Sequence, residues 1–251
     1  LRRTKSEVLL ELPPKIEQSI LIEPTMEETA FYEAVRMKAL ERIQQLDMAE
    51  NNTKRFSILA EISRLRQACC HSSLVDENMT IESSKVKTFL TLVKNIIDNK
   101  HKALIFSQFT RYLSKIKEAL DKKNISYQYL DGSTSMKERQ KAVDDFQAGI
   151  GDLFLISLKA GGTGLNLTAA DYVVILDPWW NPAVEDQASA RAHRMGQQRP
   201  VTVYRLIMKN SIEEKIITLH KNKKDLAADL LSGSDMSGKI SEEELVGLIA
   251  G

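Results

Sequence analysis

The sequence predicts an α/β fold in which a parallel sheet is covered by helices on both faces. Short apolar, β-prone runs occur at 103–106, 127–130, 153–157, 172–176 and 201–206. Helix-like sequence fills most of the intervals, at 109–123, 135–147 and 182–194, and again after the last run at 211–225. This alternation is typical of parallel strands joined by right-handed helical crossovers.

A helical brace region is predicted before the sheet. Thr25 is followed three residues later by Glu28, which is the capping-box pattern, and apolar residues recur at helical spacing over 25–48. Two more helices are expected at 54–70 and 83–99. The residues expected to face inward are Phe31, Val35, Met37, Leu40, Ile43 and Leu46 in the first helix, and Phe56, Leu59, Ile62 and Leu65 in the second. We expect these helices to act mainly as structural braces.

Four segments are therefore expected along the chain. Residues 1–24, which contain Pro13-Pro14, are predicted to be a linker or brace. Residues 25–100 form a helical extension packed on the lobe, and 101–225 form the lobe that holds the sheet. Residues 226–251 are expected to be a flexible loop followed by a short capped helix at 240–250.

Composition indicates an ordinary globular protein. The 251 residues are 43% hydrophobic and 27% charged, with a formal net charge of +1. A nucleic-acid site, if present, must therefore be a local patch. No apolar run reaches membrane-spanning length and no secretory segment opens the chain, so no membrane partner is expected. Because the chain begins at Leu1 rather than Met, we expect it to be part of a longer protein.

The two cysteines do not indicate a metal site. Cys69 and Cys70 are adjacent, which disfavours a structural disulfide, and His71 follows them. A zinc site needs about four ligands, usually as separated pairs, and no second Cys/His cluster occurs. We predict no bound metal on this chain and a reduced, cytoplasmic environment.

Two arginines in the segment QASARAHRMGQ suggest a phosphate site. Gln187 and Arg191 are four residues apart, and Arg191 and Arg194 are three apart, so on a helix all three would share one face. Neighbouring guanidinium groups repel each other, but their fork geometry suits a phosphate chain. The alternative is a solvated basic helix face.

Polar loops follow four of the predicted strands, at 105–109, 130–140, 157–167 and 177–182. Ligands bind at the carboxyl ends of strands in open α/β sheets. Gly161, Gly162 and Gly164 could let the backbone approach a phosphate, although a tight turn explains them equally well. No G-x-x-x-x-G-K-[ST] loop and no G-x-G-x-x-G fingerprint is present.

Seven segments occur here in a diagnostic order: LRRTK…ELPPK, LRQACCH, IFSQF, YLDGSTSMKERQKAVDDF, SLKAGGTGLNLTAAD, DPWWNP and QASARAHRMGQQRPVTVYRL. Over residues 1–225 the chain resembles the C-terminal half of the Swi/Snf-type ATPases of helicase superfamily two. The sequence WWNPAVEDQA is similar to the corresponding segment in the bacterial or archaeal branch of this family. His71-Ser72-Ser73 departs from the family, which more often has proline after the histidine, and we expect a local loop change there.

The resemblance implies the second, RecA-like lobe of an ATP-driven translocase on double-stranded DNA. It assigns catalytic roles to Arg191, Arg194 and Gln187, with both arginines reaching the ATP phosphates across the lobe cleft. It assigns nucleotide binding to Gly162 and Gly164 as well. Its DNA-binding residues are Ser107, Gln108, Gly132, Ser133, Thr134, Arg139, Ser157, Lys159, Gly161, Trp180 and Asn181.

The leading interpretation is half of an enzyme. ATP and Mg would be held mainly by an N-terminal RecA-like lobe of the same protein, and this lobe alone would be inactive. The expected partners are that lobe and double-stranded DNA without sequence specificity, in a monomer that is nucleoid-associated in a prokaryote or nuclear in a eukaryote. The alternative is a nucleic-acid-binding or regulatory module without ATP turnover, and a strand-separating helicase is disfavoured.

Overall fold

The computed structural model describes residues 12–45, 51–160, 164–179, 181–227 and 241–250. The chain divides into two compact units. The first comprises Leu1–Ser19, Leu90–Leu176 and Val184–Arg205. The second comprises Ile20–Phe89, Asp177–Ala183 and Leu206–Gly251.

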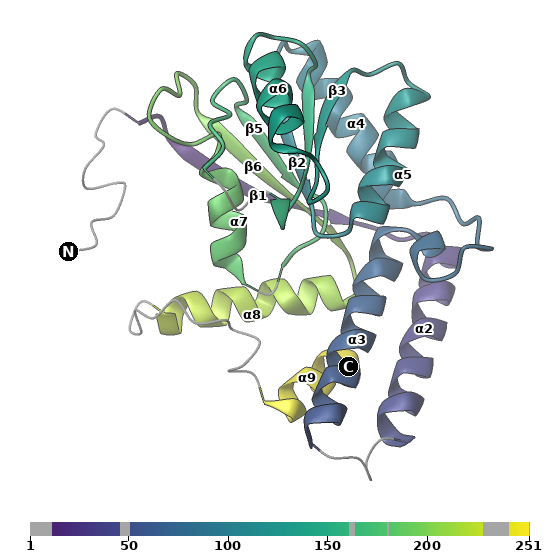
Figure 1. Cartoon of the computed structure of the whole chain (residues 1–251). Coiled ribbons are helices and arrows are strands. Elements are labelled where there is room, and N and C mark those ends of the chain that lie inside the picture. Colours follow the sequence, from purple (N-terminus) through teal and green to yellow (C-terminus); the bar gives the residue numbers. More distant parts are fainter. Residues whose placement is uncertain (1–11, 46–50, 161–163, 180, 228–240, 251) are drawn as a thin grey trace. The chain divides into compact units, whose positions relative to one another are not determined.

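A six-stranded sheet has the order β1-β6-β5-β2-β4-β3 (Figure 1). The strands are β1 (Lys15–Ile22), β2 (Ala103–Ser107), β3 (Tyr127–Leu130), β4 (Leu153–Ser157), β5 (Tyr172–Ile175) and β6 (Val201–Met208). Strand β2 lies between β4 and β5 and pairs in parallel with both. Strand β4 also pairs in parallel with β3, and β5 also pairs in parallel with β6. Every residue of β2 and β4 is buried, which explains why each strand is apolar up to its final serine.

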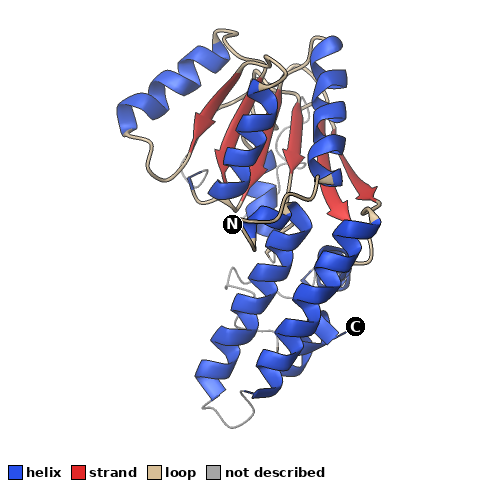
Figure 2. Ribbon diagram, turned by 90° about the vertical axis from the view of Figure 1, so that its right-hand side faces the viewer, coloured by secondary structure: helices blue, strands red, loops and turns tan. Residues whose placement is uncertain are grey.

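Helices cover both faces of this sheet, as the sequence predicts. They are α4 (Ser84–Asp98), α5 (Thr110–Asp121), α6 (Met136–Gln147) and α7 (Pro182–Ser189). The crossover β2-α5-β3 moves toward one edge of the sheet and β3-α6-β4 moves back. Right-handed crossovers in opposite directions place α5 and α6 on opposite faces, as the labelled helices of Figure 1 show, and Figure 2 shows helices on either side of the strands.

Strand β1 is an element that the sequence analysis did not predict, since it treated 1–24 as a linker or brace. Val201 N donates to Pro14 O (3.0 Å), and Lys209 N donates to Ile22 O (2.9 Å), so β1 runs alongside β6. Most of β1 is exposed, as expected for an edge strand. In its sequence KIEQSILI only the last three residues form an apolar run, which is too short to indicate the whole strand.

The second unit has a helical core. It contains α2 (Met26–Gln45), α3 (Asn51–Cys70), α8 (Ile212–Ala227) and α9 (Glu242–Ala250), with a short 3-10 turn at Ser72–Leu74. Glu28 N donates to Thr25 Oγ1 (3.2 Å) and Thr25 N to Glu28 Oε2 (2.8 Å), which confirms the predicted capping box. Helices α2, α3, α8 and α9 pack against one another around a single apolar cluster.

The buried faces of α2 and α3 differ in part from the prediction. Val35, Ile43, Ile62 and Leu65 are buried as expected. Phe31, Leu40 and Leu59 are partly buried against the core, whereas Met37 is 51% exposed and Phe56 is 75% exposed, so those two assignments were wrong. Leu46 lies outside the described residues. The stripe that is buried on α2 is instead Tyr32, Val35, Ala39 and Ile43.

Cys69 and Cys70 are buried free thiols, and burial raises the pKa of both. Within the described ranges, no group of three or more His, Cys, Asp or Glu side chains is placed to hold a metal ion. No helix in that part of the chain has the length and apolar character needed to cross a membrane.

Candidate functional site

The segment that carries the two arginines is not a continuous helix. We expected a helix over 182–194, but α7 ends at Ser189, and Arg191 and Arg194 lie in the turns that follow. Arg191 N donates to Ala188 O and Ala192 N to Ser189 O, three residues back instead of four. The side chain of Gln197 donates to Ala192 O, and Gly196 has a φ of +99°. These features end the helical geometry before the second arginine.

Gln187, Arg191 and Arg194 nevertheless line one cavity of about 380 Å³ in the first unit. Its remaining lining residues are Gly164, Leu165, Ala190 and Met195. Gly164, which has a φ of +38°, lines the cavity together with the arginine segment. The predicted grouping is present, although turns and not a helix face produce it.

The charges at this cavity repel one another. Arg191 is 7% exposed, and its Nε finds no hydrogen-bond partner among the described residues. Burial lowers the pKa of Arg191, and the positive charges of Arg194 and Arg139 lower it further. Arg194 Nη1 donates weakly to Leu165 O (3.4 Å). Burying a cation with an unused donor beside like charges costs free energy of folding. An anion bound in the cavity would offset this cost, because it would accept the free donor and neutralise charge.

Gln197 holds the arginine segment in place. Its Nε2 lies within hydrogen-bond distance of the carbonyl oxygens of Thr168 (3.2 Å), Ala170 (2.8 Å) and Ala192 (3.1 Å). Its Oε1 accepts from the backbone N–H groups of the next two residues, both at 2.9 Å. Sequence reasoning missed Gln197, because an amide that satisfies loop carbonyls has no periodic signal.

Ser107 and Ser157 lie side by side at the carboxyl ends of β2 and β4. Both are buried, and both hydroxyl groups are used locally. Ser107 Oγ accepts from Phe109 N (3.0 Å), and Ser157 Oγ accepts from Ala160 N (3.3 Å). Gln108 is half-buried next to Ser107, and Lys159 is exposed two residues after β4. The serines therefore shape the loops at this edge, while Lys159 can reach solvent.

The loop after β3 is organised by Asp131, a residue that sequence reasoning did not single out. Its Oδ1 accepts from Ser133 N (2.8 Å), Ser133 Oγ (2.6 Å) and Thr134 Oγ1 (3.4 Å). The hydrogen bond from the Ser133 hydroxyl is the largest cause that lowers the pKa of Asp131. The donors expected to meet a DNA phosphate thus converge on a carboxylate of the same loop. A Cβ at Gly132 would meet nothing within 4 Å, so open space lies beside them.

In the second unit, Arg66 anchors the segment that precedes Trp180. Arg66 is 1% exposed, and its Nη2 donates to Pro178 O (2.8 Å) and Asp177 Oδ2 (3.3 Å). Its guanidinium lies 5.0 Å from the ring centroid of Trp179. Asn181 Oδ1 accepts from Ala183 N (3.0 Å) at the start of α7. Trp180, Gly161 and Gly162 lie outside the described residues, so their assignments stay predictions.

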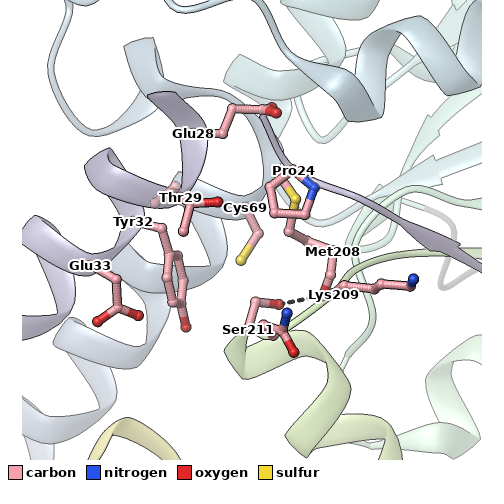
Figure 3. Close-up of a pocket in the computed structure, with 11 residues that line it drawn as sticks. Pro24, Glu28, Thr29, Tyr32, Glu33, Cys69, Met208, Lys209 and Ser211 are labelled. Carbon is pink, nitrogen blue, oxygen red and sulfur yellow. Dashed lines mark hydrogen bonds between the residues drawn. The ribbon is translucent and has the colours of Figure 1, made fainter. Parts of the chain in front are cut away.

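A smaller cavity of about 80 Å³ occurs in the second unit (Figure 3). Tyr32, Cys69, Met208 and Ser211 are among its lining residues. Ser211 Oγ donates to Met208 O (2.7 Å), and Tyr32 Oη accepts from Ile212 N (2.8 Å). These polar groups form hydrogen bonds with the backbone at the start of α8, and we assign no ligand to this cavity.

The parallel sheet, its helices on both faces and its polar loops at the carboxyl edge define a RecA-like lobe. The helicase conserved C-terminal domain matches residues 84–196, and the SNF2-related domain matches residues 1–74. The Sulfolobus solfataricus SWI2/SNF2 ATPase C-terminal domain is 30% identical, with a TM-score of 0.76 over 94% of this chain and 98% of that one. The chain therefore belongs to the SWI2/SNF2 family and has the fold of its C-terminal domain.

Longer relatives match almost all of this chain. The Sulfolobus solfataricus SWI2/SNF2 ATPase core in complex with double-stranded DNA is 32% identical, with a TM-score of 0.78 over 100% of this chain and 53% of that one. An uncharacterized ATP-dependent helicase of Mycoplasma pneumoniae is 38% identical over 99% of this chain and 24% of its own length. The chain thus spans about a quarter of the length of the curated relatives that it matches.

Proposed function

We propose that this chain is the second motor lobe of an ATP-dependent double-stranded-DNA translocase and that Arg191 and Arg194 contact the ATP phosphates. The observation that carries the proposal is the arginine cavity. It combines a buried guanidinium with an unused Nε, a second guanidinium beside it, and a positive-φ glycine on the wall. Planar guanidinium forks fit phosphate oxygens, and phosphoryl transfer requires mainly positioned positive charge.

ATP and Mg²⁺ are proposed to be held mainly by another lobe. The sequence contains no G-x-x-x-x-G-K-[ST] loop that would supply the phosphate-cradling lysine. Within this lobe, Gln187 and Gly164 line the arginine cavity and would lie close to the phosphate chain. Arg191 would then act only when the two lobes enclose the nucleotide, and this lobe alone would be inactive.

The DNA contacts are proposed to be phosphate contacts without sequence preference. Ser133 and Thr134 form a loop whose donors already converge on one anionic oxygen of Asp131. Lys159 is exposed at the same carboxyl edge of the sheet. Hydroxyl, backbone N–H and lysine donors read the phosphate backbone rather than the bases, which suits a motor that tracks along DNA. The solved relative with double-stranded DNA supports this class of partner.

The proposal is tested by phosphate release from this chain alone and from the protein that joins it to its first lobe. We expect no DNA-stimulated release from the chain alone and clear stimulation from the two-lobe protein. Robust turnover by the chain alone would contradict the half-enzyme assignment. A two-lobe protein that binds DNA but releases no phosphate would favour a binding or regulatory module.

A further inference from the structure

His193 lies between Arg191 and Arg194 and contacts a distant part of the chain. Its Nε2 is 2.7 Å from the carbonyl oxygen of Pro13, which lies 180 residues earlier in the sequence. A carbonyl oxygen only accepts hydrogen bonds, so Nε2 carries the proton. Both the neutral tautomer protonated at Nε2 and the doubly protonated ring can make this contact.

Charged groups of β1 hold the helix that leads into the same segment. Lys15 Nζ contacts Asp186 Oδ1 (3.2 Å) on α7. Arg205 joins Glu17 of β1 (3.0 Å) to Glu185 of α7 (2.6 Å). Glu185 is 1% exposed, so its charge is removed from water, and the guanidinium of Arg205 compensates it. The segment 13–17 therefore contacts both the helix before the arginines and the histidine between them.

Over 190–196 the backbone keeps only two i→i−4 hydrogen bonds, from Ala190 N to Asp186 O (2.9 Å) and from His193 N to Ser189 O (3.0 Å), and the other bonds are those of turns. Side-chain contacts therefore help to determine where the arginines lie. On the side of residues 167–170, the segment is held by Gln197 and by the hydrogen bond from Leu167 N to Arg191 O (3.1 Å). His193 holds it from the β1 side. Without His193, the turn between the arginines would lose its hydrogen bond to the carbonyl oxygen of Pro13.

We infer that His193 is a positioning residue and that, through it, the segment 13–17 sets the location of Arg191 and Arg194. This inference rests on the proposed function of the arginines. A displacement of the Pro13 carbonyl would move the turn that carries both guanidinium groups. Misplacement of a catalytic group by about 1 Å can cost on the order of a hundredfold in rate.

A matched pair of substitutions in the two-lobe protein tests this. His193→Gln keeps an N–H donor near the position of Nε2, whereas His193→Asn has the same amide but is one methylene shorter. We expect His193→Gln to keep kcat within about twofold. We expect His193→Asn to lower kcat about tenfold or more, with a smaller change in KM for ATP, because the arginines would act mainly on the charge that develops in the transition state. Amide hydrogen exchange over 190–196 should be faster in His193→Asn alone.

Equal behaviour of the two variants in turnover and exchange would overturn the inference. So would a loss of turnover in His193→Asn that only parallels a fall in melting temperature, since the contact would then be merely structural. Arg191→Ala and Arg194→Ala are measured alongside. If these two arginine variants retain turnover, the proposed function fails. The difference in amide hydrogen exchange between His193→Gln and His193→Asn then decides by itself whether His193 positions the segment.

Discussion

Lys85 Nζ lies 2.6 Å from both carboxylate oxygens of Glu213, and both side chains are fully buried. Glu213 Oε2 also accepts from Met208 N (2.8 Å), so the pair ties α4 and α8 to the end of β6. Burial alone would lower the pKa of Lys85, but the charge of Glu213 raises it above its usual value. The lysine therefore stays charged in the core.

Removing one partner of this pair should be strongly destabilising. We expect Lys85→Met to lower the free energy of unfolding by about 3–5 kcal/mol, because it leaves the Glu213 carboxylate buried without its cation. The double variant Lys85→Met with Glu213→Leu should lose less. Denaturant unfolding of both variants measures this, and a single variant as stable as the parent would refute the coupling.

Glu17 gives the first unit an acid-sensitive contact. Burial would raise the pKa of Glu17, but the hydrogen bond from Lys15 and the charge of Arg205 lower it from 4.5 to about 2. A depressed carboxyl pKa stabilises the fold above the unfolded pKa, and this contribution is lost as the pH falls from about 4.5 to about 2. After allowance for solvent screening of this half-buried group, it amounts to roughly 1 kcal/mol.

Glu17→Gln should therefore lower the melting temperature at pH 7 and have little effect near pH 2. Glu23→Gln is the control, since Glu23 follows directly after β1, is 69% exposed and pairs with the exposed Lys209. Equal pH profiles for the parent and Glu17→Gln would show that the contact contributes nothing.

Gln197 offers a sharp test of the arginine segment. Gln197→Glu would place a carboxylate against three carbonyl oxygens, so the buried acceptors would face each other without a proton. We expect a loss of about 3 kcal/mol or more in the free energy of unfolding. Gln198→Glu, at the exposed neighbouring position, should stay within about 0.5 kcal/mol of the parent. Similar stabilities of the two variants would contradict the role of Gln197.

Substitution of Lys159 tests the proposal that DNA phosphates bind at the carboxyl edge of the sheet. If it meets a phosphate, Lys159→Ala should weaken binding to all duplex sequences alike and reduce the salt slope by about one. Lys94→Ala is the control, because Lys94 pairs with Asp98 on the exposed face of α4. Binding titrations over a range of salt concentrations measure both. An unchanged slope for Lys159→Ala would remove Lys159 from the interface.

Much of the fold could be predicted because its signals are local. The strands β2 and β4 are buried on both faces, so their sequences ALIFS and LFLIS are apolar up to the serine that ends each strand. The capping box at Thr25 fixes the start of α2 within the sequence itself. Strand β1 could not be predicted, because an edge strand needs only backbone partners and tolerates charged residues.

The sequence indicated which residues belong to the candidate site, but it did not indicate the backbone conformation that brings them together. The spacing of Arg191 and Arg194 suggested a helix face, while the structure places them in turns held by Gln197 and His193. Arg66 was missed because its carbonyl partner, Pro178 O, is distant in sequence and only the fold brings it there. Asp131 was missed although its hydroxyl partner Ser133 is local, and an Asx-turn pattern in the loop could have indicated it. Met37 and Phe56 were misplaced because tertiary packing, not periodicity, selects which stripe of a helix is buried.

The central claim is that Arg191 and Arg194 act on the ATP phosphates. The most direct measurement is turnover at saturating ATP and duplex DNA by Arg191→Ala and Arg194→Ala in the two-lobe protein, with thermal melting of the same variants. Arg199→Ala is the control, since Arg199 is 59% exposed and contacts Asp171 away from the cavity. We expect each cavity variant to lose on the order of a thousandfold in turnover while keeping its fold, and lysine should not restore it. Near-normal turnover in both alanine variants, or a loss that occurs only together with unfolding, would contradict the assignment.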